Sequence, residues 1–412
     1  MRLRSLASAL AATTAAVLAG ALIPAGASAD PQQPAAQGAQ PLAPLVAASQ
    51  GRVIAGEYLV VLKRRQGDST LTARRHGGTV LREYRTALTG YAARLDAVAL
   101  AAVRRDPQVK FVQPNARQAG SAGGTQANAP WHLDRIDQRA FPLDSTYHWA
   151  STGKGVTAYV IDSGVRGTHT EFGGRVKAGF SAIDDGNGTS DCATGTGHGT
   201  FVASEIGGKT YGVARQVSLV PVRVLDCTGN GSTEQIVAGM DWVAQHHTSP
   251  AVANISIESF QGAADPAMDQ AAAGLISSGV ITTLIAGNFD RGDCQNSPKD
   301  PRAIIAAAST ISDARNTIWN NSSYGPCVTV FAPGAEITGA GVANDTAVAN
   351  NWFGTSMAAP LVAGALAKVL QTRPTLTMAQ AKQLVIDTST KNTLTDVGTG
   401  SPNRLLYSAP TT

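Results

Sequence analysis

Aromatic and charged residues are scarce in this sequence of 412 residues. Phe, Trp and Tyr make up 5% of the chain, and Asp, Glu, Lys and Arg make up 15%. Together with 43 glycines, this composition favours a tightly turned fold rich in small residues over a long coiled coil. Hydrophobic residues make up 43% of the chain, which is ordinary for a globular protein and excludes disorder as its main state. The net charge of +4 is too small to indicate a nucleic-acid partner.

Long apolar runs are absent beyond the start of the chain. No later stretch reaches about 18 consecutive apolar residues, so we expect no later membrane span. At the start, Arg2 and Arg4 precede an apolar stretch from Leu6 to Ile23, and an A-x-A site follows at residues 27–29. This order is typical of a secretory signal peptide over residues 1–29, whereas two threonines within the modest apolar run disfavour a transmembrane helix. We therefore expect a secreted, extracellular protein with no membrane association once the signal is removed.

The C-x-x-C spacing is also absent, which argues against a metal site built from the cysteines. An exported protein reaches an oxidising compartment, where cysteines form disulfides. We therefore expect two disulfides from the four cysteines of the chain, which are Cys192, Cys227, Cys294 and Cys327.

The remaining chain divides into a linker, a small domain and a large domain. Residues 30–51 are rich in Pro, Gln and Ala and predict a flexible linker. Residues 52–117 predict a small α+β, ferredoxin-like domain, because strands and helices follow one another in β-α-β-β-α-β order. Its expected elements lie at 57–63, 71–76, 79–84, 91–95, 98–105 and 109–113. A second linker, rich in Gly, Ser and Ala, is expected at 118–124, before a domain that spans 125–412.

The large domain alternates apolar strands with helices. The expected strands are almost continuously apolar, as in sheets buried on both faces; they lie at 156–161, 217–225, 251–257, 280–287, 303–309 and 328–333. The expected helices lie at 198–207, 232–247, 266–278 and 355–371. This alternation predicts an α/β fold with a doubly wound, mostly parallel sheet and helices on both faces. Active sites in such sheets lie beyond the carboxyl ends of the strands.

Three motifs place polar residues after expected strands or at the starts of expected helices, where an active site of this fold would lie. VIDSG puts Asp162 after a strand, GTGHGT puts His198 at the start of a helix, and FGTSMAAP puts Ser356 at the start of another. Each motif alone is common in structural roles. Together they predict acyl transfer, because a serine hydroxyl needs a base and the base needs an orienting carboxylate, and Asp-His-Ser is a known chain order for that geometry.

A fourth motif, IAGN, places Asn288 at the end of the strand 280–287. A side-chain amide at this position can donate to a developing oxyanion, with the backbone N–H of Ser356 as the second donor. The alternative is that Asn288 only caps the strand. Its position among the other three motifs favours the oxyanion-hole interpretation.

VIDSG, GHGTFVAS, VANISI, IAGN and GTSMAAPLVAG closely resemble the signatures of the subtilases, the subtilisin-like serine proteases, over about residues 128–408. NAPWHLDRID, VRVLDCTGNGST and SPNRLLYS resemble the proteinase K branch, in particular the aqualysin-like secreted enzymes. The block 57–113 resembles the inhibitor-type propeptide of such enzymes. The resemblance implies a zymogen whose propeptide acts as intramolecular chaperone and inhibitor and is cleaved autocatalytically near Gly120 to Thr125. It also implies the disulfides Cys192–Cys227 and Cys294–Cys327.

Five positions depart from the residues usual in that family. Phe201 and Ser204 replace the second His and the Gly of H-G-T-H-V-A-G. Phe353 stands where a small residue usually precedes G-T-S, and Leu361 stands where a His usually follows A-x-P. The fifth departure, Glu258, lies in the segment that the resemblance assigns to substrate binding.

That segment is usually S-L-G-G and here is Ser256, Ile257, Glu258 and Ser259. The usual Gly lets a substrate strand pair with the enzyme backbone, whereas Glu258 adds a side chain and a negative charge. One hypothesis is a narrowed site that disfavours bulky apolar side chains and tolerates basic ones. A second is a slow or substrate-restricted enzyme, and a third is that neighbouring residues compensate.

We therefore expect a monomeric serine endopeptidase whose partners are protein or peptide substrates and its own propeptide. The chemistry needs no cofactor, although subtilases often bind structural calcium; no ligand is assigned, and the loop carboxylates considered are Asp184, Asp185, Asp313 and Asp345. The main alternative is a catalytically weak or inactive secreted binding protein of this fold. An esterase is disfavoured because Ser356 does not lie in G-x-S-x-G.

The charge divides unequally between the two expected domains. Residues 30–123 carry 13 basic and 6 acidic residues, whereas residues 124–412 carry 18 basic and 23 acidic residues. The basic character therefore belongs to segments expected to be removed. We hypothesise that the opposite signs help the propeptide and the protease to associate.

Overall fold

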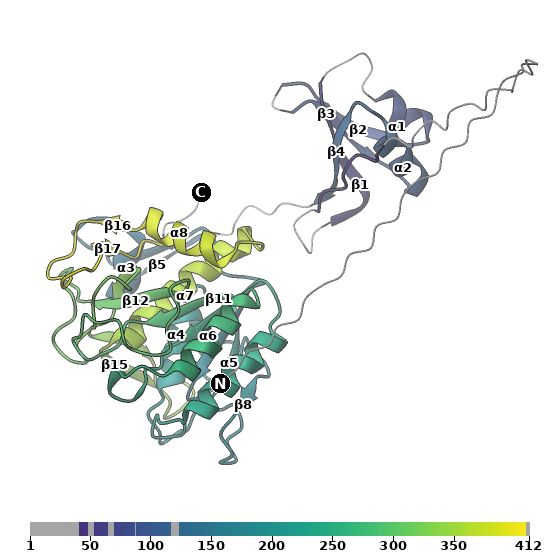
Figure 1. Ribbon diagram of the computed structural model, residues 1–412. Coiled ribbons are helices and arrows are strands. Elements are labelled where there is room, and N and C mark those ends of the chain that lie inside the picture. The colour runs from purple at the N-terminus through teal and green to yellow at the C-terminus, as the bar shows by residue number, and fades with distance from the viewer. Residues whose placement is uncertain (1–40, 48–52, 65–69, 87, 117–122, 409–412) are drawn as a thin grey trace, which may run out of the picture. The chain divides into compact units, whose positions relative to one another are not determined.

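The computed structural model describes residues 41–47, 53–64, 70–86, 88–116 and 123–408. The chain divides into two compact units, Met1–Arg117 and Gln118–Thr412; Figure 1 colours the described part of the first from purple to blue and that of the second from blue through green to yellow. The expected signal peptide, most of the first linker and most of the second lie outside the described residues.

The first unit is a four-stranded sheet in the order β2-β3-β1-β4, with every neighbouring pair antiparallel. Its elements are β1 (Val53–Leu62), α1 (Leu71–Arg75), β2 (Thr79–Tyr84), β3 (Gly90–Arg94), α2 (Ala97–Arg105) and β4 (Val109–Ala116). α2 begins where the Asp96 carboxylate accepts the N–H of Ala99 at 2.8 Å, as an N-cap does. The element order agrees with the ferredoxin-like pattern predicted from the sequence.

Residues 41–47 correct the prediction of a flexible linker over 30–51. Leu45 forms a parallel bridge with Val112 of β4, and the N–H of Ala43 donates to Arg104 O at 2.7 Å. Ala43 is buried against the core of this unit. The linker prediction rested on the high Pro, Gln and Ala content, but backbone groups of this stretch pair with the edge strand β4: the N–H of Val46 donates to Val112 O at 2.8 Å, and the N–H of Val112 donates to Pro44 O at 2.9 Å.

The second unit is built on a nine-stranded sheet in the order β16-β17-β13-β12-β11-β10-β7-β9-β8. Its strands are β7 (Thr157–Asp162), β8 (Phe180–Ser181), β9 (Ser218–Arg223), β10 (Ala251–Ile255), β11 (Ile281–Ile285), β12 (Ile304–Ser309), β13 (Val330–Pro333), β16 (Thr390–Lys391) and β17 (Arg404–Leu405). All neighbours are parallel except β16 and β17. The continuously buried central strands explain why their sequences are apolar without alternation.

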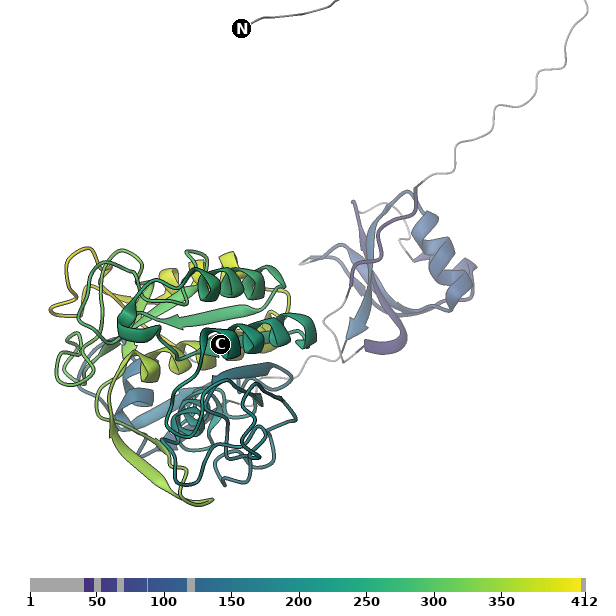
Figure 2. The ribbon, with the colours of Figure 1, turned by 60° about the horizontal axis from the view of Figure 1, so that its bottom comes forward.

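Helices cover both faces of this sheet (Figures 1 and 2). α5 (Thr233–His246) packs on α6 (Pro266–Ser277), whereas α4 (His198–Gly207) packs on α7 (Thr355–Thr372). α5 begins with the predicted capping box, in which Ser232 and Gln235 each accept the other's backbone N–H. α7 is buried along most of its length and contacts β10, β11, β12 and β13. The predicted doubly wound α/β fold is confirmed.

Several elements were not predicted. Besides the short strands β8, β16 and β17, they are α3 (Trp131–Asp137), α8 (Met378–Thr388), the 3₁₀ turn η1 (Phe260–Gly262), and the antiparallel pairs β5 (Gly124–Ala127) with β6 (Thr146–Trp149) and β14 (Ile337–Ala340) with β15 (Val348–Trp352). The β14–β15 hairpin contacts α4 and therefore contributes to the surroundings of its first residue, His198. Among the described residues, no helix has the length and apolar character needed to cross a membrane.

Candidate active site

Asp162 and His198 meet at the carboxyl end of β7. Asp162 is the last residue of β7 and His198 is the first residue of α4. The Nδ1 atom of His198 lies 2.8 Å from Oδ1 and 3.0 Å from Oδ2 of Asp162. Gly199 permits this approach, because a Cβ there would lie 2.2 Å from the carbonyl oxygen of Gly164.

The electrostatics of the pair suit a general base. Asp162 is fully buried, while the His198 side chain is 21% exposed. Burial acts to lower the pKa of His198, but attraction to the Asp162 carboxylate and the hydrogen bond to it outweigh burial and raise this pKa above its ordinary value. The hydrogen bond to Asp162 holds the proton on Nδ1, so Nε2 is the nitrogen left to accept a proton.

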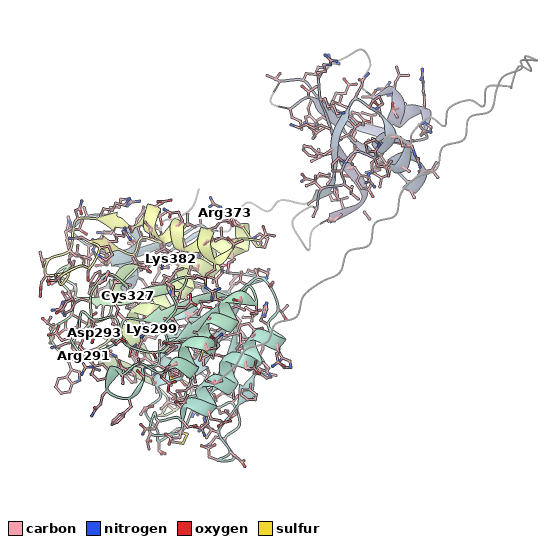
Figure 3. The ribbon with its side chains drawn as sticks, viewed as in Figure 1. Arg291, Asp293, Lys299, Cys327, Arg373 and Lys382 are labelled. Carbon is pink, nitrogen blue, oxygen red and sulfur yellow. A yellow bond between two sulfur atoms is a disulfide. The ribbon has the colours of Figure 1, made fainter. Side chains whose placement is uncertain are left out.

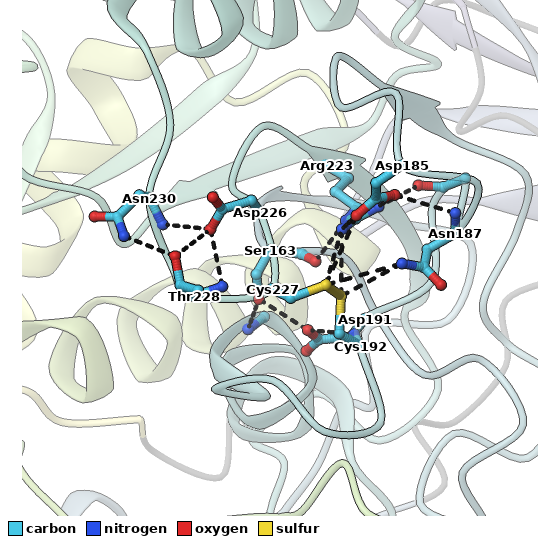
Figure 4. The surroundings of a disulfide bond; sticks show 12 residues. Ser163, Asp185, Asn187, Asp191, Cys192, Arg223, Asp226, Cys227, Thr228 and Asn230 are labelled. Carbon is cyan, nitrogen blue, oxygen red and sulfur yellow. Dashed lines mark hydrogen bonds and ion pairs between the residues drawn. A yellow bond between two sulfur atoms is a disulfide. The ribbon is translucent and has the colours of Figure 1, made fainter.

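A buried hydrogen-bond network, of which Figure 4 labels Ser163 and Asp191, holds Asp162 in place. The N–H of Ser163 donates to Asp162 Oδ1 at 2.7 Å, and the Ser163 hydroxyl donates to Asp191 at 3.1 Å. Asp191 in turn accepts the N–H and the hydroxyl of Thr200, on α4, at 2.9 and 2.7 Å. Asp191 thus links the residue after Asp162 to the helix that carries His198, and no sequence motif indicates this link.

The disulfide Cys192–Cys227 borders this network (Figure 4). The buried guanidinium of Arg223 donates to Asp185 through two nitrogens, at 2.6 and 2.5 Å, and to Ser163 O at 3.1 Å. These hydrogen bonds from Arg223 lower the pKa of Asp185 far below its ordinary value. The pairing of the cysteines is the one that the resemblance implies.

The groups beside this disulfide are poor ligands for a cation. The sulfurs of Cys192 and Cys227 lie near the Asp185 carboxylate, but a disulfide offers no thiolate to a metal and Arg223 already neutralises the carboxylate. Two of the other carboxylates considered for calcium are likewise paired with arginines, Asp313 with Arg135 and Asp345 with Arg166.

Ser356 lies at the start of α7, opposite Ser256, which follows β10. The Ser356 hydroxyl donates to the carbonyl oxygen of Ser256 at 3.3 Å, and the Ser256 hydroxyl donates to the carbonyl oxygen of Ser356 at 3.0 Å. Asn254 and Thr283 extend this chain of buried hydrogen bonds into the sheet. Because Ser356 lies in the first turn of α7, its N–H has no acceptor within the helix and remains available to a ligand.

Asn288 joins the Ser356 region to Glu258. Its Oδ1 atom accepts the N–H of Thr355 at 2.8 Å and the Thr355 hydroxyl at 3.0 Å. Its Nδ2 atom donates to both carboxylate oxygens of Glu258 at 3.3 Å, and its backbone N–H donates to Glu258 Oε2 at 2.9 Å. The amide predicted to receive an oxyanion is therefore hydrogen-bonded to a side chain of the protein itself.

Glu258 also acts on His198. Burial raises the pKa of Glu258, while the side-chain and backbone hydrogen bonds from Asn288 and attraction to His198 oppose the increase. In the other direction, the Glu258 carboxylate contributes to the raised pKa of His198. The sequence marked Glu258 as a departure, but the contact with Asn288 could not be read from it.

An aromatic stack covers the other side of His198. The Trp352 ring lies 4.5 Å from the Phe201 ring at an interplanar angle of 11°, and 5.8 Å from the imidazole of His198. Phe201 is fully buried. Ser204, one turn further along α4, accepts the N–H of Ala340 in β14 at 2.9 Å. Both departures in α4 therefore contact the β14–β15 hairpin.

The remaining residues singled out in the sequence lie after β10 (Ile257), between β15 and α7 (Phe353) and within α7 (Leu361). Leu361 is fully buried in the core and Ile257 is buried. Phe353 is half-buried, and its carbonyl oxygen accepts the side-chain amide of Asn320 at 3.0 Å.

Two cavities flank this region. One, of about 380 Å³, includes Asn288 in its lining, together with Phe289, Asp290, Ile318, Trp319, Asn320 and Asn321. Ile318 and Trp319 are largely exposed there. The other, of about 450 Å³, has in its lining Lys299, Lys382 and the Cys294–Cys327 disulfide but none of the predicted catalytic residues; Figure 3 labels Lys299, Cys327 and Lys382.

The fold and this site define a class of protein, the serine hydrolases that use an aspartate–histidine pair on an α/β sheet. Residues 153–405 match the model of the subtilase family, and residues 57–118 match that of the peptidase inhibitor I9 family. The chain belongs to the subtilase family.

Relatives and a solved structure agree with this assignment. The chain is 41% identical to an extracellular serine proteinase of Thermus sp. (strain Rt41A), over 89% of this chain and 92% of the relative. It is 36% identical to a cuticle-degrading protease of Metarhizium anisopliae, over 89% of this chain and 92% of the relative. The crystal structure of a cold adapted subtilisin-like serine proteinase has a TM-score of 0.64 and 43% identity, and the match covers 68% of this chain and 99% of that one.

The protein is thus a secreted, subtilisin-like serine endopeptidase with an N-terminal inhibitor-type domain. The names of the relatives support the catalytic interpretation over the inactive binding protein that we kept as the alternative.

Proposed function

We propose that Ser356, His198 and Asp162 hydrolyse peptide bonds through an acyl-enzyme. The Ser356 Oγ attacks the substrate carbonyl carbon and its proton passes to His198 Nε2. When the tetrahedral intermediate collapses, the C–N bond breaks and the same proton passes to the leaving amine. A water molecule then repeats the attack on the ester, again through His198, and releases the acid and the free serine.

Asp162 orients the imidazole in this mechanism and stabilises its protonated form. Asn288 Nδ2 and the N–H of Ser356 hold the oxyanion, and residues 256–258 hold the substrate strand. The observation that carries the proposal is the hydrogen bond between the buried Asp162 and His198 Nδ1, which leaves Nε2 as the free base.

Covalent labelling tests this assignment. A fluorophosphonate probe reacts with an activated serine, so we expect the wild-type mature enzyme to be labelled and the Ser356→Ala variant to remain unlabelled. Hydrolysis of casein in preference to small esters identifies the activity as proteolytic. Equal labelling of both proteins would refute the role of Ser356.

We propose further that the chain is made as a zymogen. Signal removal after residue 29 and self-cleavage within 118–124 would leave residues 125–412 as a monomeric enzyme, inhibited by the I9-type domain until release. The match of residues 57–118 to peptidase inhibitor I9 supports this order. N-terminal sequencing of the product from wild-type and Ser356→Ala cultures tests it, because only the active chain should lose the first unit.

The calcium requirement is tested separately. Activity that survives a calcium chelator would show that the enzyme needs no calcium for activity.

A further inference from the structure

We propose that Glu258 is a displaceable occupant of the oxyanion donors, which a cationic group of the substrate draws away. The proposal rests on the catalytic role of Ser356 and Asn288 given above, and it assigns Glu258 a part in activity as well as in substrate choice.

The orientation of the Asn288 amide carries the first step. The backbone N–H of Thr355 is always a donor, so the atom 2.8 Å from it must be the amide oxygen. The NH₂ group of Asn288 therefore faces Glu258, and its two contacts of 3.3 Å are hydrogen bonds to the carboxylate. The same NH₂ group is the one that an oxyanion would need.

The carboxylate has to move before the oxyanion forms. Two negative groups cannot share the same donors, since each would lose its hydrogen bond and repel the other. The backbone around Glu258 is held on both sides, because Ser256 is hydrogen-bonded to Ser356 and Ser259 is hydrogen-bonded in both directions to Ser297. Glu258 itself is only half-buried, so rotation of its side chain is the available movement.

The charge of Glu258 indicates which group displaces it. Among the described residues, no lysine or arginine forms an ion pair with Glu258, and attraction to Glu258 comes from His198 in its protonated form. A cationic side chain of a bound substrate would supply the missing partner and free the Asn288 amide. An aliphatic side chain of the same length would leave the carboxylate on the amide.

Matched peptides and variants test the proposal. One peptide carries lysine before the scissile bond and the other carries norleucine, which keeps the aliphatic chain without the charge. We expect a higher kcat for lysine in the wild-type enzyme. Loss of one oxyanion donor costs about 10²–10³ in rate, so its partial occlusion predicts that Glu258→Ala raises kcat for norleucine by roughly tenfold. The lysine to norleucine ratio of kcat should then fall towards one.

Three controls make the result specific. Glu234→Gln removes an exposed carboxylate from α5 and should leave both peptides unaffected. In the Asn288→Ala background, Glu258→Ala should bring no increase in kcat, because the donor that it frees is gone. Glu258→Gln keeps the size of the side chain without its charge and should also raise kcat for norleucine.

Unchanged or lower kcat for norleucine in both Glu258 variants, with Ser356 still labelled by the fluorophosphonate, would overturn this proposal alone. A wild-type enzyme that is not labelled would instead overturn the proposed catalytic function. A lysine preference that appears only in KM, with no increase in kcat for norleucine in Glu258→Ala, would make Glu258 a simple binding residue and would also overturn the proposal.

Discussion

Replacing Asp162 by asparagine keeps the size of the side chain and removes its charge. The N–H of Ser163 donates to Oδ1 at 2.7 Å and would hold the asparagine oxygen in that position. The new NH₂ group would then replace Oδ2, which lies 3.0 Å from His198 Nδ1. One of the two contacts to the imidazole would change from an acceptor to a donor, which favours the tautomer that carries its proton on Nε2.

The expected loss is large because both functions of Asp162 fail together. The wrong tautomer cannot take the Ser356 proton, and the imidazolium that forms during attack has no counter-charge. Replacement of such an orienting aspartate by asparagine costs about 10⁴ in kcat, or about 5.4 kcal/mol of transition-state stabilisation. Since Asp162 raises the pKa of His198, its removal should also move the acidic limb of the kcat/KM profile to lower pH.

The assay is peptide hydrolysis against pH, normalised by the folded fraction from circular dichroism. Asp241→Asn, which changes an exposed carboxylate on α5, is the matched control and should keep the wild-type profile. A loss of less than about tenfold in Asp162→Asn, or an acidic limb that does not move, would refute the orienting role.

Three further outcomes follow from the packing. Phe201→Ala should remove the stack on Trp352 and lower the free energy of unfolding by about 3–5 kcal/mol in urea titrations. The same variant should change kcat by a larger factor than KM. Phe201→Tyr should keep most of the stability and most of kcat. Burial lowers the pKa of Lys368 from 10.5 to about 7. Between these two pH values the folded state binds fewer protons than the unfolded state, so the free energy of unfolding should rise with pH. Lys368→Met should flatten that rise, and an unchanged slope would contradict it. Replacement of both Cys294 and Cys327 by serine opens a loop with a sequence separation of 33 and should cost about 3–4 kcal/mol in the same titration without changing the pH–rate profile.

The elements that carry the catalytic residues could be predicted because their signals are local. β7 is a continuous apolar run and α4 follows a glycine-rich turn, so the positions of Asp162 and His198 relative to these elements follow from the sequence. Trp352 had no such signal, because it comes from a short hairpin whose strands are partly exposed. The contact between Glu258 and Asn288 depends on side-chain rotamers at the ends of two adjacent strands, which no sequence pattern encodes.

The residues that depart from the usual subtilase pattern differ in how their surroundings accommodate them. Phe201 gains the stack on Trp352, Ser204 gains the N–H of Ala340, and Leu361 is enclosed by the core. Each of these side chains is neutral and is accommodated by packing or by a hydrogen bond outside the reacting atoms. Glu258 brings a charge, and its hydrogen-bond donors are those of Asn288. We therefore expect a change at Glu258 to alter kcat directly, whereas changes at Ser204 and Leu361 should act mainly on stability.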